Sequence, residues 1–198
     1  MYPPRQYIEN DFARLLTHIE KSPLASLIYQ NAQDDIELCH IPLVLDENKQ
    51  HLLGHIAANN PLAKLLAKQP LNIKCLFNGA DCYVSPNDAE KVYLPTWHYA
   101  KLEIKGTAQP ITKPSQKRQI MAYSVAQFED KLATQWQLSQ VDENEISQSL
   151  KYIMVFKIEI TEILGNFKLS QDKASETREE IKQSLYARGD KDSAELIY

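Results

Sequence analysis

Short runs of alternating apolar and polar residues, separated by turn-forming residues, limit the fold of this chain more than any other feature. Leu24–Gln30 is a short apolar run, and the polar stretch Asn31–Asp35 is typical of a hairpin turn. Ile36–Val44 follows with a period of two, and a second turn, Asp46–Gln50, leads into His51–Ala57. The pattern predicts antiparallel strands joined by hairpins.

The rest of the chain adds strands and helices to this pattern. Asn78-Gly79 is a hairpin signal between two predicted strands, Leu71–Phe77 and Cys82–Ser85. Further strands are predicted at Trp97–Thr107, after a loop over Pro86–Pro95, and at Ile153–Leu164. Helices are predicted from Asn60-Pro61 to about Lys68, over Pro114–Trp136 with a buried stripe of Met121, Val125, Phe128, Leu132 and Trp136, and over Ser175–Arg188. We therefore expect a mainly β, α+β fold: an antiparallel barrel with helical additions.

Composition limits the partners. Of 198 residues, 22 are Lys or Arg and 26 are Asp or Glu, and the resulting charge of −4 argues against a DNA-binding face. Three cysteines, an odd count in apolar settings, indicate reduced thiols. No signal peptide and no apolar run of about 18 residues is recognisable. A soluble cytoplasmic protein without a membrane partner is expected.

The segment Gly54–Pro61 combines two elements that suit a ligand. A strand that carries His55 and Ala57 on one face runs directly into a helix start at Asn59-Asn60. The N-terminus of a helix presents unpaired N–H groups and partial positive charge, which favour a phosphate. Spacing alone favours an ordinary strand followed by a capped helix.

Two further segments carry chemistry. In Pro95–Tyr99, the alternation of a strand places Trp97 on one face and Thr96 and His98 on the other, an arrangement suited to a flat heterocycle or to a half-buried edge strand. In Asn166–Gln171, polar and apolar residues alternate directly after a strand. A metal site is not expected, because Gly54 and the strand period argue against the helix that a His51–His55 zinc pair would need. A nucleophilic triad, a P-loop and a Rossmann motif are not indicated either.

Six short segments occur in the order of one known family. They are Met1-Tyr2-Pro3-Pro4, His40-Ile41-Pro42-Leu43, Gly54-His55-Ile56-Ala57 with Asn60-Pro61, Tyr83-Val84-Ser85-Pro86, Pro95-Thr96-Trp97-His98-Tyr99 and Lys168-Leu169-Ser170-Gln171. Together they resemble the PaiB-type FMN-binding proteins, often labelled negative transcriptional regulators. The chain departs from the family's usual pattern at Asn87-Asp88-Ala89-Glu90, where the family has an aromatic pair, and at His98 and Asp172, where it often has Asn.

The resemblance implies an FMN-binding split β-barrel over residues 1–170, with an inserted helix at about 113–136. It also implies a helical C-terminal extension over 171–198 that packs on the barrel or the dimer partner, and a homodimer with FMN at the subunit interface. The implied pocket residues are His40, His55, Ala57, Asn59, Asn60, Tyr83, Ser85, Thr96, Trp97, His98, Lys168, Ser170 and Gln171. Among these we assign Asn59, Asn60 and Lys168 to the phosphate, and Trp97, His55 and His98 to the ring system.

The resemblance leaves three functions open. The first is an FMN-dependent redox protein, an oxidoreductase, or a flavin-binding regulator, for which His55 and His98 are the available acids or bases because histidine titrates near neutrality. The second is a transcriptional regulator that acts directly or indirectly on DNA, although the acidic balance disfavours direct contact. The third is a haem-binding or haem-degrading protein, with His18, His40, His51, His55 and His98 as candidate iron ligands.

Overall fold

The structure is a computed structural model that describes residues 1–92 and 94–198. The strands are β1 (Ile8–Glu9), β2 (Leu24–Gln30), β3 (Ile36–Pro42), β4 (Val44–Leu45), β5 (His51–Ala57), β6 (Leu71–Val84), β7 (Thr96–Ile111) and β8 (Ile153–Lys168). The α-helices are α1 (Phe12–Lys21), α2 (Pro61–Leu66), α3 (Pro114–Glu129), α4 (Glu143–Ser149), α5 (Ser175–Ala187) and α6 (Lys191–Glu195). Short 3-10 turns are η1 (Arg5–Tyr7), η2 (Pro86–Asp88), η3 (Leu138–Gln140) and η4 (Leu150–Tyr152). The predicted loop Pro86–Pro95 includes Tyr93, which lies outside the described residues.

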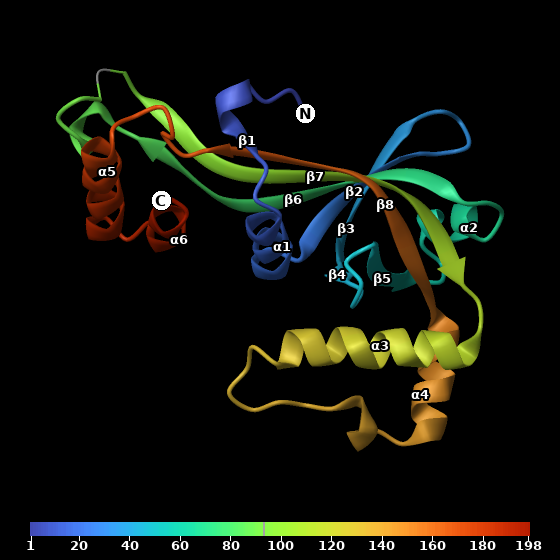
Figure 1. Cartoon of the computed structure of the whole chain (residues 1–198). Coiled ribbons are helices and arrows are strands. Elements are labelled where there is room, and N and C mark those ends of the chain that lie inside the picture. Colours follow the sequence, from blue (N-terminus) through green and yellow to red (C-terminus); the bar gives the residue numbers. More distant parts are fainter. Residues whose placement is uncertain (93) are drawn as a thin grey trace. The chain divides into compact units, whose positions relative to one another are not determined.

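These elements form two compact units. The first unit comprises Met1–Ser22, Phe77–Glu103 and Ile163–Tyr198, and the second comprises Pro23–Leu76 and Ile104–Glu162. The hydrogen-bonded strand order is β3-β2-β6-β7-β8-β5-β4, with β1 beside β8, and β6, β7 and β8 contribute to both units (Figure 1). The registers of β1 with β8, β2 with β3 and β6, and β5 with β4 and β8 are antiparallel. The predicted α+β fold with an antiparallel sheet is confirmed.

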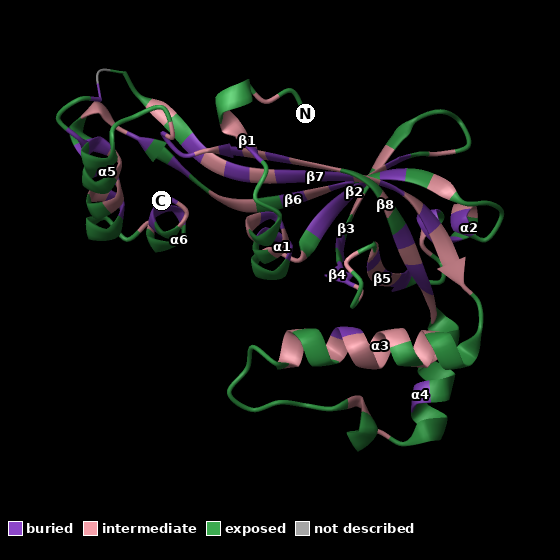
Figure 2. Ribbon diagram, viewed as in Figure 1, coloured by how far each residue is buried: buried purple, intermediate pink, exposed green. Residues whose placement is uncertain are grey.

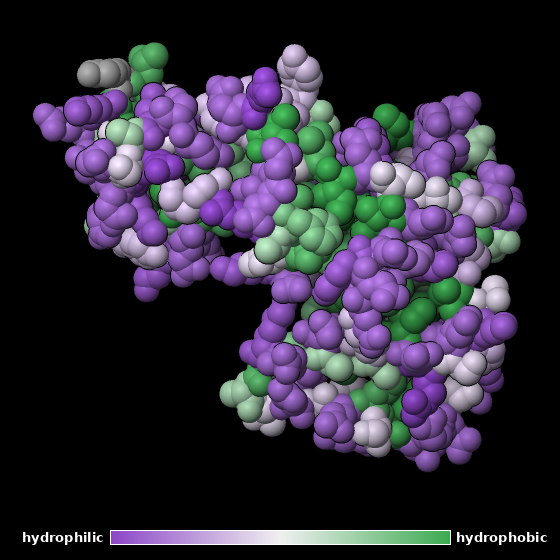
Figure 3. All heavy atoms as spheres, in the orientation of Figure 1, coloured by the Kyte–Doolittle hydropathy of each residue, from purple (hydrophilic) through white to green (hydrophobic). Residues whose placement is uncertain are grey.

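In the first unit, helices pack their apolar side inward. Helix α1, which the sequence pattern did not predict, begins after Asp11, whose carboxylate accepts the N–H of Ala13 at 2.9 Å, and it buries Leu15 and Ile19. Helices α5 and α6 share a buried cluster with β6 and the η2 segment, made of Cys82, Val84, Ala89, Val92, Ile181, Leu185, Ala194 and Ile197. The surface of α5 and α6 seen in Figure 3 is correspondingly hydrophilic.

The hairpin predicted at Asn78-Gly79 is wrong, because β6 continues through both residues without a turn. Gly79 does not have the positive φ that this hairpin signal depends on. Its lack of a side chain serves packing instead. A Cβ at Gly79 would lie 2.3 Å from Cε1 of His18, so the glycine makes room for the imidazole of α1.

The second unit is built around antiparallel strand pairs, as the sequence pattern predicted. β2 and β5 have the predicted bounds, and Leu27, Leu52 and Phe156 are fully buried. Figure 2 shows buried residues in purple along the strands. Gly54 on β5 leaves room for the buried side chain of Leu43, since a Cβ there would lie 2.6 Å from its Cδ2.

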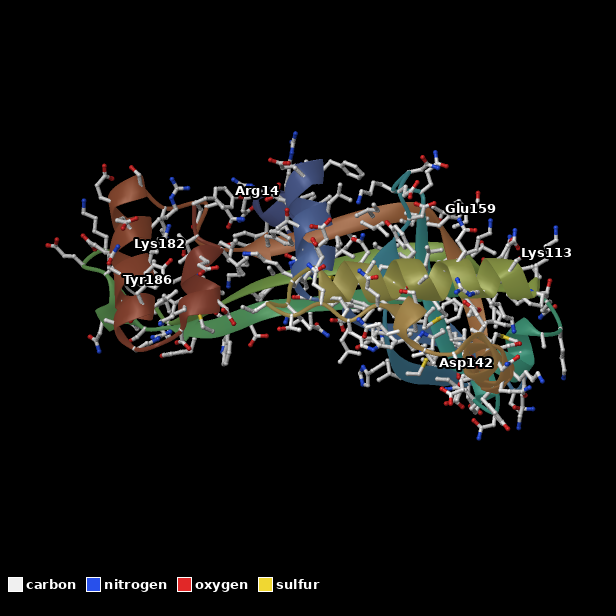
Figure 4. All side chains as sticks on the ribbon, turned by 90° about the horizontal axis from the view of Figure 1, so that it is seen from below. Arg14, Lys113, Asp142, Glu159, Lys182 and Tyr186 are labelled. Carbon is white, nitrogen blue, oxygen red and sulfur yellow. The ribbon has the colours of Figure 1, made fainter. Side chains whose placement is uncertain are left out.

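The helix predicted over Pro114–Trp136 is too long, since α3 ends at Glu129. The Glu129 carboxylate accepts the backbone N–H of Trp136 at 2.8 Å, so the chain has turned back by that residue. The predicted apolar stripe is not a buried face: Ser124 is the buried residue of α3, and Leu132 and Trp136 are exposed. Helix α4, which was not predicted, begins after Asp142, whose carboxylate accepts the N–H of Asn144 at 2.8 Å. Figure 4 labels Lys113 and Asp142, the residues that directly precede α3 and α4.

The structure also bears on the cysteines and on membrane-spanning helices. Cys75 and Cys82 are buried and Cys39 is half-buried, all three as free thiols, and burial raises the pKa of Cys75 to about 12. Among the described helices, none has the length and apolar character that a membrane crossing requires.

Candidate functional site

Four of the predicted site residues meet in the first unit, where the end of β8 lies beside the start of β7. The ammonium of Lys168 donates a hydrogen bond to the hydroxyl of Thr96. Two residues further along both segments, Nε2 of His98 and Oγ of Ser170 are 2.7 Å apart. The Lys168 ammonium is close enough to His98 to lower the pKa of its imidazole, so the two pairs lie near each other. We call Thr96, His98, Lys168 and Ser170 the strand-end cluster.

The imidazole of the strand-end cluster is enclosed and neutral. His98 is 1% exposed. Burial and then the nearby Lys168 ammonium lower its pKa to about 4, although Asp88 and Asp172 act in the opposite direction. Its Nδ1 has no hydrogen-bond partner among the described residues. A buried polar atom without a partner is unusual in a folded protein and calls for an explanation.

Ser170 lies in a tight turn that follows β8. Its φ is +60°, a left-handed conformation that is uncommon for residues other than glycine. The carbonyl of Ser170 accepts the N–H of Lys173 at 2.9 Å. The amide side chain of Gln171 accepts the N–H of Leu169 at 2.7 Å and donates to the carbonyl of Phe167. Gln171, predicted as a pocket residue, therefore stabilises the turn through its side chain.

Two exposed aromatic rings lie on the neighbouring strands β6 and β7. Tyr83 of β6 and Trp97 of β7 are 45% and 54% exposed, with ring centroids 6.3 Å apart at an interplanar angle of 69°. Large apolar rings left open on a folded chain often mark a binding surface. The alternation predicted for Pro95–Tyr99 is confirmed, because Trp97 is exposed and His98 is buried.

Ser85 and its neighbours form a local cap. The Ser85 hydroxyl accepts the N–H of Asn87 at 3.1 Å, and the Asp88 carboxylate accepts the N–H of Ser85 at 2.7 Å. Asp88 is buried, and the guanidinium of Arg188 at the end of α5 pairs with it at 3.1 Å and also donates to the carbonyl of Tyr83. The acidic residue that departs from the family pattern thus has a partner, which sequence spacing could not reveal because the two residues are 100 positions apart.

The second unit holds the other five candidates. His55 is half-buried on β5, and burial lowers its pKa, while Ala57 and Asn59 are exposed. The predicted cap is confirmed, because Oδ1 of Asn60 accepts the N–H of Leu62 at 2.9 Å. His40, on β3, is exposed, and its Nδ1 lies 3.1 Å from the Ser26 hydroxyl.

The start of α2 offers little to a phosphate. The helix has six residues, its first residue is Pro61, which has no N–H, and the N–H of Leu62 is taken by Asn60. The assignment of Asn59 and Asn60 to the phosphate therefore stays a prediction, and the geometry of this helix start does not add to it.

A cavity of about 780 Å³ lies in the first unit between α1, β6 and α6. None of the predicted pocket residues lines it. His18 forms part of the wall, with Nε2 3.2 Å from the carbonyl oxygen of Phe77, and burial lowers its pKa. Arg14, labelled in Figure 4, projects from α1 with its guanidinium 3.3 Å from the ring centroid of Tyr198. Groups of three or more side chains able to hold a metal ion are absent from the described part of the chain.

Known proteins are similar to this chain in both sequence and fold. The family described as "Putative FMN-binding domain" matches residues 1–162. The chain belongs to this family. FMN is accordingly the cofactor that the family indicates. Lys168, Ser170 and Gln171 lie beyond the matched residues, so their part in the site rests on the geometry of the strand-end cluster.

Individual relatives are distant. The chain is 28% identical to the uncharacterized protein AN0679 of Emericella nidulans, over 89% of this chain and 82% of that one. It is 25% identical to the protease synthase and sporulation protein PAI 2 of Bacillus subtilis, over 83% and 73%. The fold is similar to the FAD and heme binding protein of Mycobacterium smegmatis, with a TM-score of 0.64, 14% identity and coverage of 92% and 80%. It is also similar to the flavocytochrome Anf3 of Azotobacter vinelandii, with a TM-score of 0.58, 13% identity and coverage of 82% and 69%.

Proposed function

We propose that this chain is an FMN-dependent redox protein, an oxidoreductase that acts as a homodimer with the flavin at the subunit interface. The strand-end cluster is the observation that carries the proposal. It brings a half-buried ammonium and a nearly buried hydroxyl together at one strand end, and both are donors that suit an anionic oxygen. The exposed rings of Tyr83 and Trp97 suit the flat face of a flavin.

The residues of the chain would bind and orient the cofactor, while FMN, when bound, supplies the capacity for hydride or electron transfer. The donor set fits the phosphate of this group, since it combines a cationic and a hydroxyl donor, whereas the Trp97 ring lies on the opposite face of β7 from Thr96 and His98. His55 is the better candidate to hold or release a proton, because it is only half-buried. His98 is enclosed, so we assign it no contact with the ring system.

Exposed apolar side chains on β2 and β3 support the homodimer. Leu24, Ile36 and Leu38 are 59%, 79% and 56% exposed in the second unit. They lie on one face of the two strands, because Leu24 pairs with Pro42 and the other two alternate along β3. An apolar face of this kind is typical of a surface that another molecule covers. Light scattering should give the mass of two chains, and Leu38→Lys should shift it toward one.

The redox proposal can be tested directly. Purified protein should show the visible absorbance of bound flavin, or acquire it when FMN is added, and a nicotinamide should bleach that absorbance under anaerobic conditions. A protein that stays colourless in excess FMN would overturn the proposal. Bound flavin that no nicotinamide reduces would favour the regulatory role, directly on DNA or through another molecule, and a salt-dependent gel shift would then test for DNA contact.

Haem binding is the second candidate, favoured by the names of the two similar structures, one a FAD and heme binding protein and the other a flavocytochrome. Titration with haem should produce a shifted Soret band if a histidine ligates the iron. Replacement of His18, which lines the cavity of the first unit, should remove that shift if this cavity is the site.

A further inference from the structure

The His98–Ser170 pair of the strand-end cluster has one hydrogen-bond donor without an acceptor among the described residues. A neutral imidazole carries one N–H, and in His98 it lies on either Nε2, beside Ser170, or Nδ1, which has no partner. Either tautomer leaves one buried donor without a partner among the described residues: Nδ1–H if Ser170 donates to Nε2, or the Ser170 O–H if Nε2 carries the proton. A ligand oxygen beside Ser170 favours the Nε2 tautomer, because it accepts the Ser170 O–H while His98 donates to the Ser170 oxygen.

This tautomer decides what Ser170 can do. If the Ser170 oxygen accepts from His98, its own O–H hydrogen must be donated to a different atom. The described residues offer no acceptor for it, since His98 is the partner of the Ser170 hydroxyl there. The left-handed backbone of Ser170 and the side chain of Gln171 hold this hydroxyl in place. Strained residues held by several bonds are a feature of ligand sites.

Lys168 provides a second donor near His98 and Ser170, with its ammonium 5.9 Å from the ring centroid of Tyr7. One of the three ammonium protons bonds Thr96, and the pairing of Lys168 with Thr96 lies next to that of Ser170 with His98. A cation and a hydroxyl donor two residues apart match the several anionic oxygens of a phosphate.

We infer that His98 is a positioning residue that fixes Ser170 as a hydrogen-bond donor to the phosphate of FMN, next to the ammonium of Lys168. This inference rests on the proposed binding of FMN. It moves the phosphate contact from the start of α2, where Pro61 and the Asn60 cap remove donors, to the end of β8. It also changes the role of His98 from a flavin contact to a support of Ser170.

The test compares variants that share the loss of one hydroxyl but differ in backbone strain. Ser170→Gly removes the backbone strain of the positive φ, whereas Ser170→Ala keeps it. The pair therefore separates the effect of the lost hydroxyl from the effect of a change in folding stability. Both should bind FMN about tenfold more weakly than the wild type, the loss of one hydrogen bond to a charged group. Both should also shift the ³¹P resonance of bound FMN, and affinity for riboflavin, which has no phosphate, should stay unchanged.

Variants of His98 test the positioning step. His98→Gln places an amide N–H where Nε2 lies and should retain the affinity and the ³¹P resonance of the wild type. His98→Asn is too short to reach Ser170 and should behave like Ser170→Gly. Asn59→Ala, in the second unit, should leave the ³¹P resonance unchanged.

The outcomes are separable. If the wild type takes up no FMN, the proposed function fails. If the wild type binds FMN and Ser170→Gly binds it equally well with the same ³¹P resonance, the inference alone is wrong. A loss of affinity in Ser170→Ala but not in Ser170→Gly would assign the effect to the backbone and overturn it. A ³¹P shift in Asn59→Ala but not in Ser170→Gly would return the phosphate to α2.

Discussion

The strand-end cluster of the first unit and the segment His55–Asn60 of the second unit look alike as sequence but differ in the structure. Both contain a histidine and short polar side chains at a strand end. In the first, the side chains bond one another across two strands, as His98 does with Ser170. In the second, Asn60 bonds its own helix backbone, and Asn59 is exposed. Cross-strand bonding fixes donors for a ligand, whereas local capping consumes them.

The largest expected effect comes from the enclosed imidazole. Unfolded His98 takes up a proton as the pH falls below 6.5, but the folded chain does not protonate it until about pH 4. The free energy of unfolding should therefore decrease by about 3 kcal/mol between pH 6.5 and pH 4 and be insensitive to His98 above pH 7. Urea denaturation across this range measures it. His98→Gln should have a shallower slope, and an equal slope in both proteins would contradict an enclosed His98.

The second-largest effect tests the ion pair between Arg188 and Asp88 in the first unit. Arg188→Ala removes the guanidinium from the buried Asp88 and from the carbonyl of Tyr83. We expect a loss of about 2 kcal/mol, below the usual value for a buried pair because the Arg188 side chain is 32% exposed. Chemical denaturation measures it. Asp88→Asn with Arg188→Ala should be less than additive, and strict additivity would show that the two residues are not coupled.

Lysines on the two segments provide a matched pair for ligand affinity. Lys168→Met removes the ammonium of the strand-end cluster and should weaken FMN binding about tenfold, since hydrogen bonds from charged donors are the stronger class. Lys64→Met, at an exposed position of α2, should change the affinity less than twofold. Fluorescence titration gives both constants. A larger loss for Lys64→Met would reverse the comparison between the segments.

The smallest effect tests the local role of Asn60. Asn60→Ala removes the cap of α2 and should decrease the free energy of unfolding by about 1 kcal/mol. FMN affinity, measured where the variant is fully folded, should match the wild type. If Asn60→Ala instead lost affinity at unchanged stability, Asn60 would be a ligand contact and the comparison would fail.

Local patterns were sufficient for several elements. β2 and β5 have the predicted bounds, because the period of two and the flanking turns are properties of neighbouring residues. The cap at Asn60 was predicted for the same reason. The hairpin prediction at Asn78-Gly79 was wrong because Gly79 makes room for the ring of His18, which is distant in sequence.

The candidate residues divide in the same way. The motif with Thr96 and His98 and the motif with Lys168 and Ser170 were recognised separately, and strand alternation predicted that His98 and Trp97 point to opposite faces. Their pairing could not be predicted, since 72 residues separate the two halves of each contact. The partner of Asp88 was missed because an arginine on a helix gives no local sign of a distant carboxylate.

The sequence by itself determined the antiparallel α+β class and the resemblance to an FMN-binding family, because periodicity, capping and short motifs depend on residues close together in the chain. Only the tertiary structure decided that His98 is enclosed and hydrogen-bonded with Ser170, that Gln171 holds a turn, and that the start of α2 has few donors left for a phosphate. Burial and hydrogen-bond partners are set by which distant segments pack together, and this packing determines which polar groups remain free for a ligand.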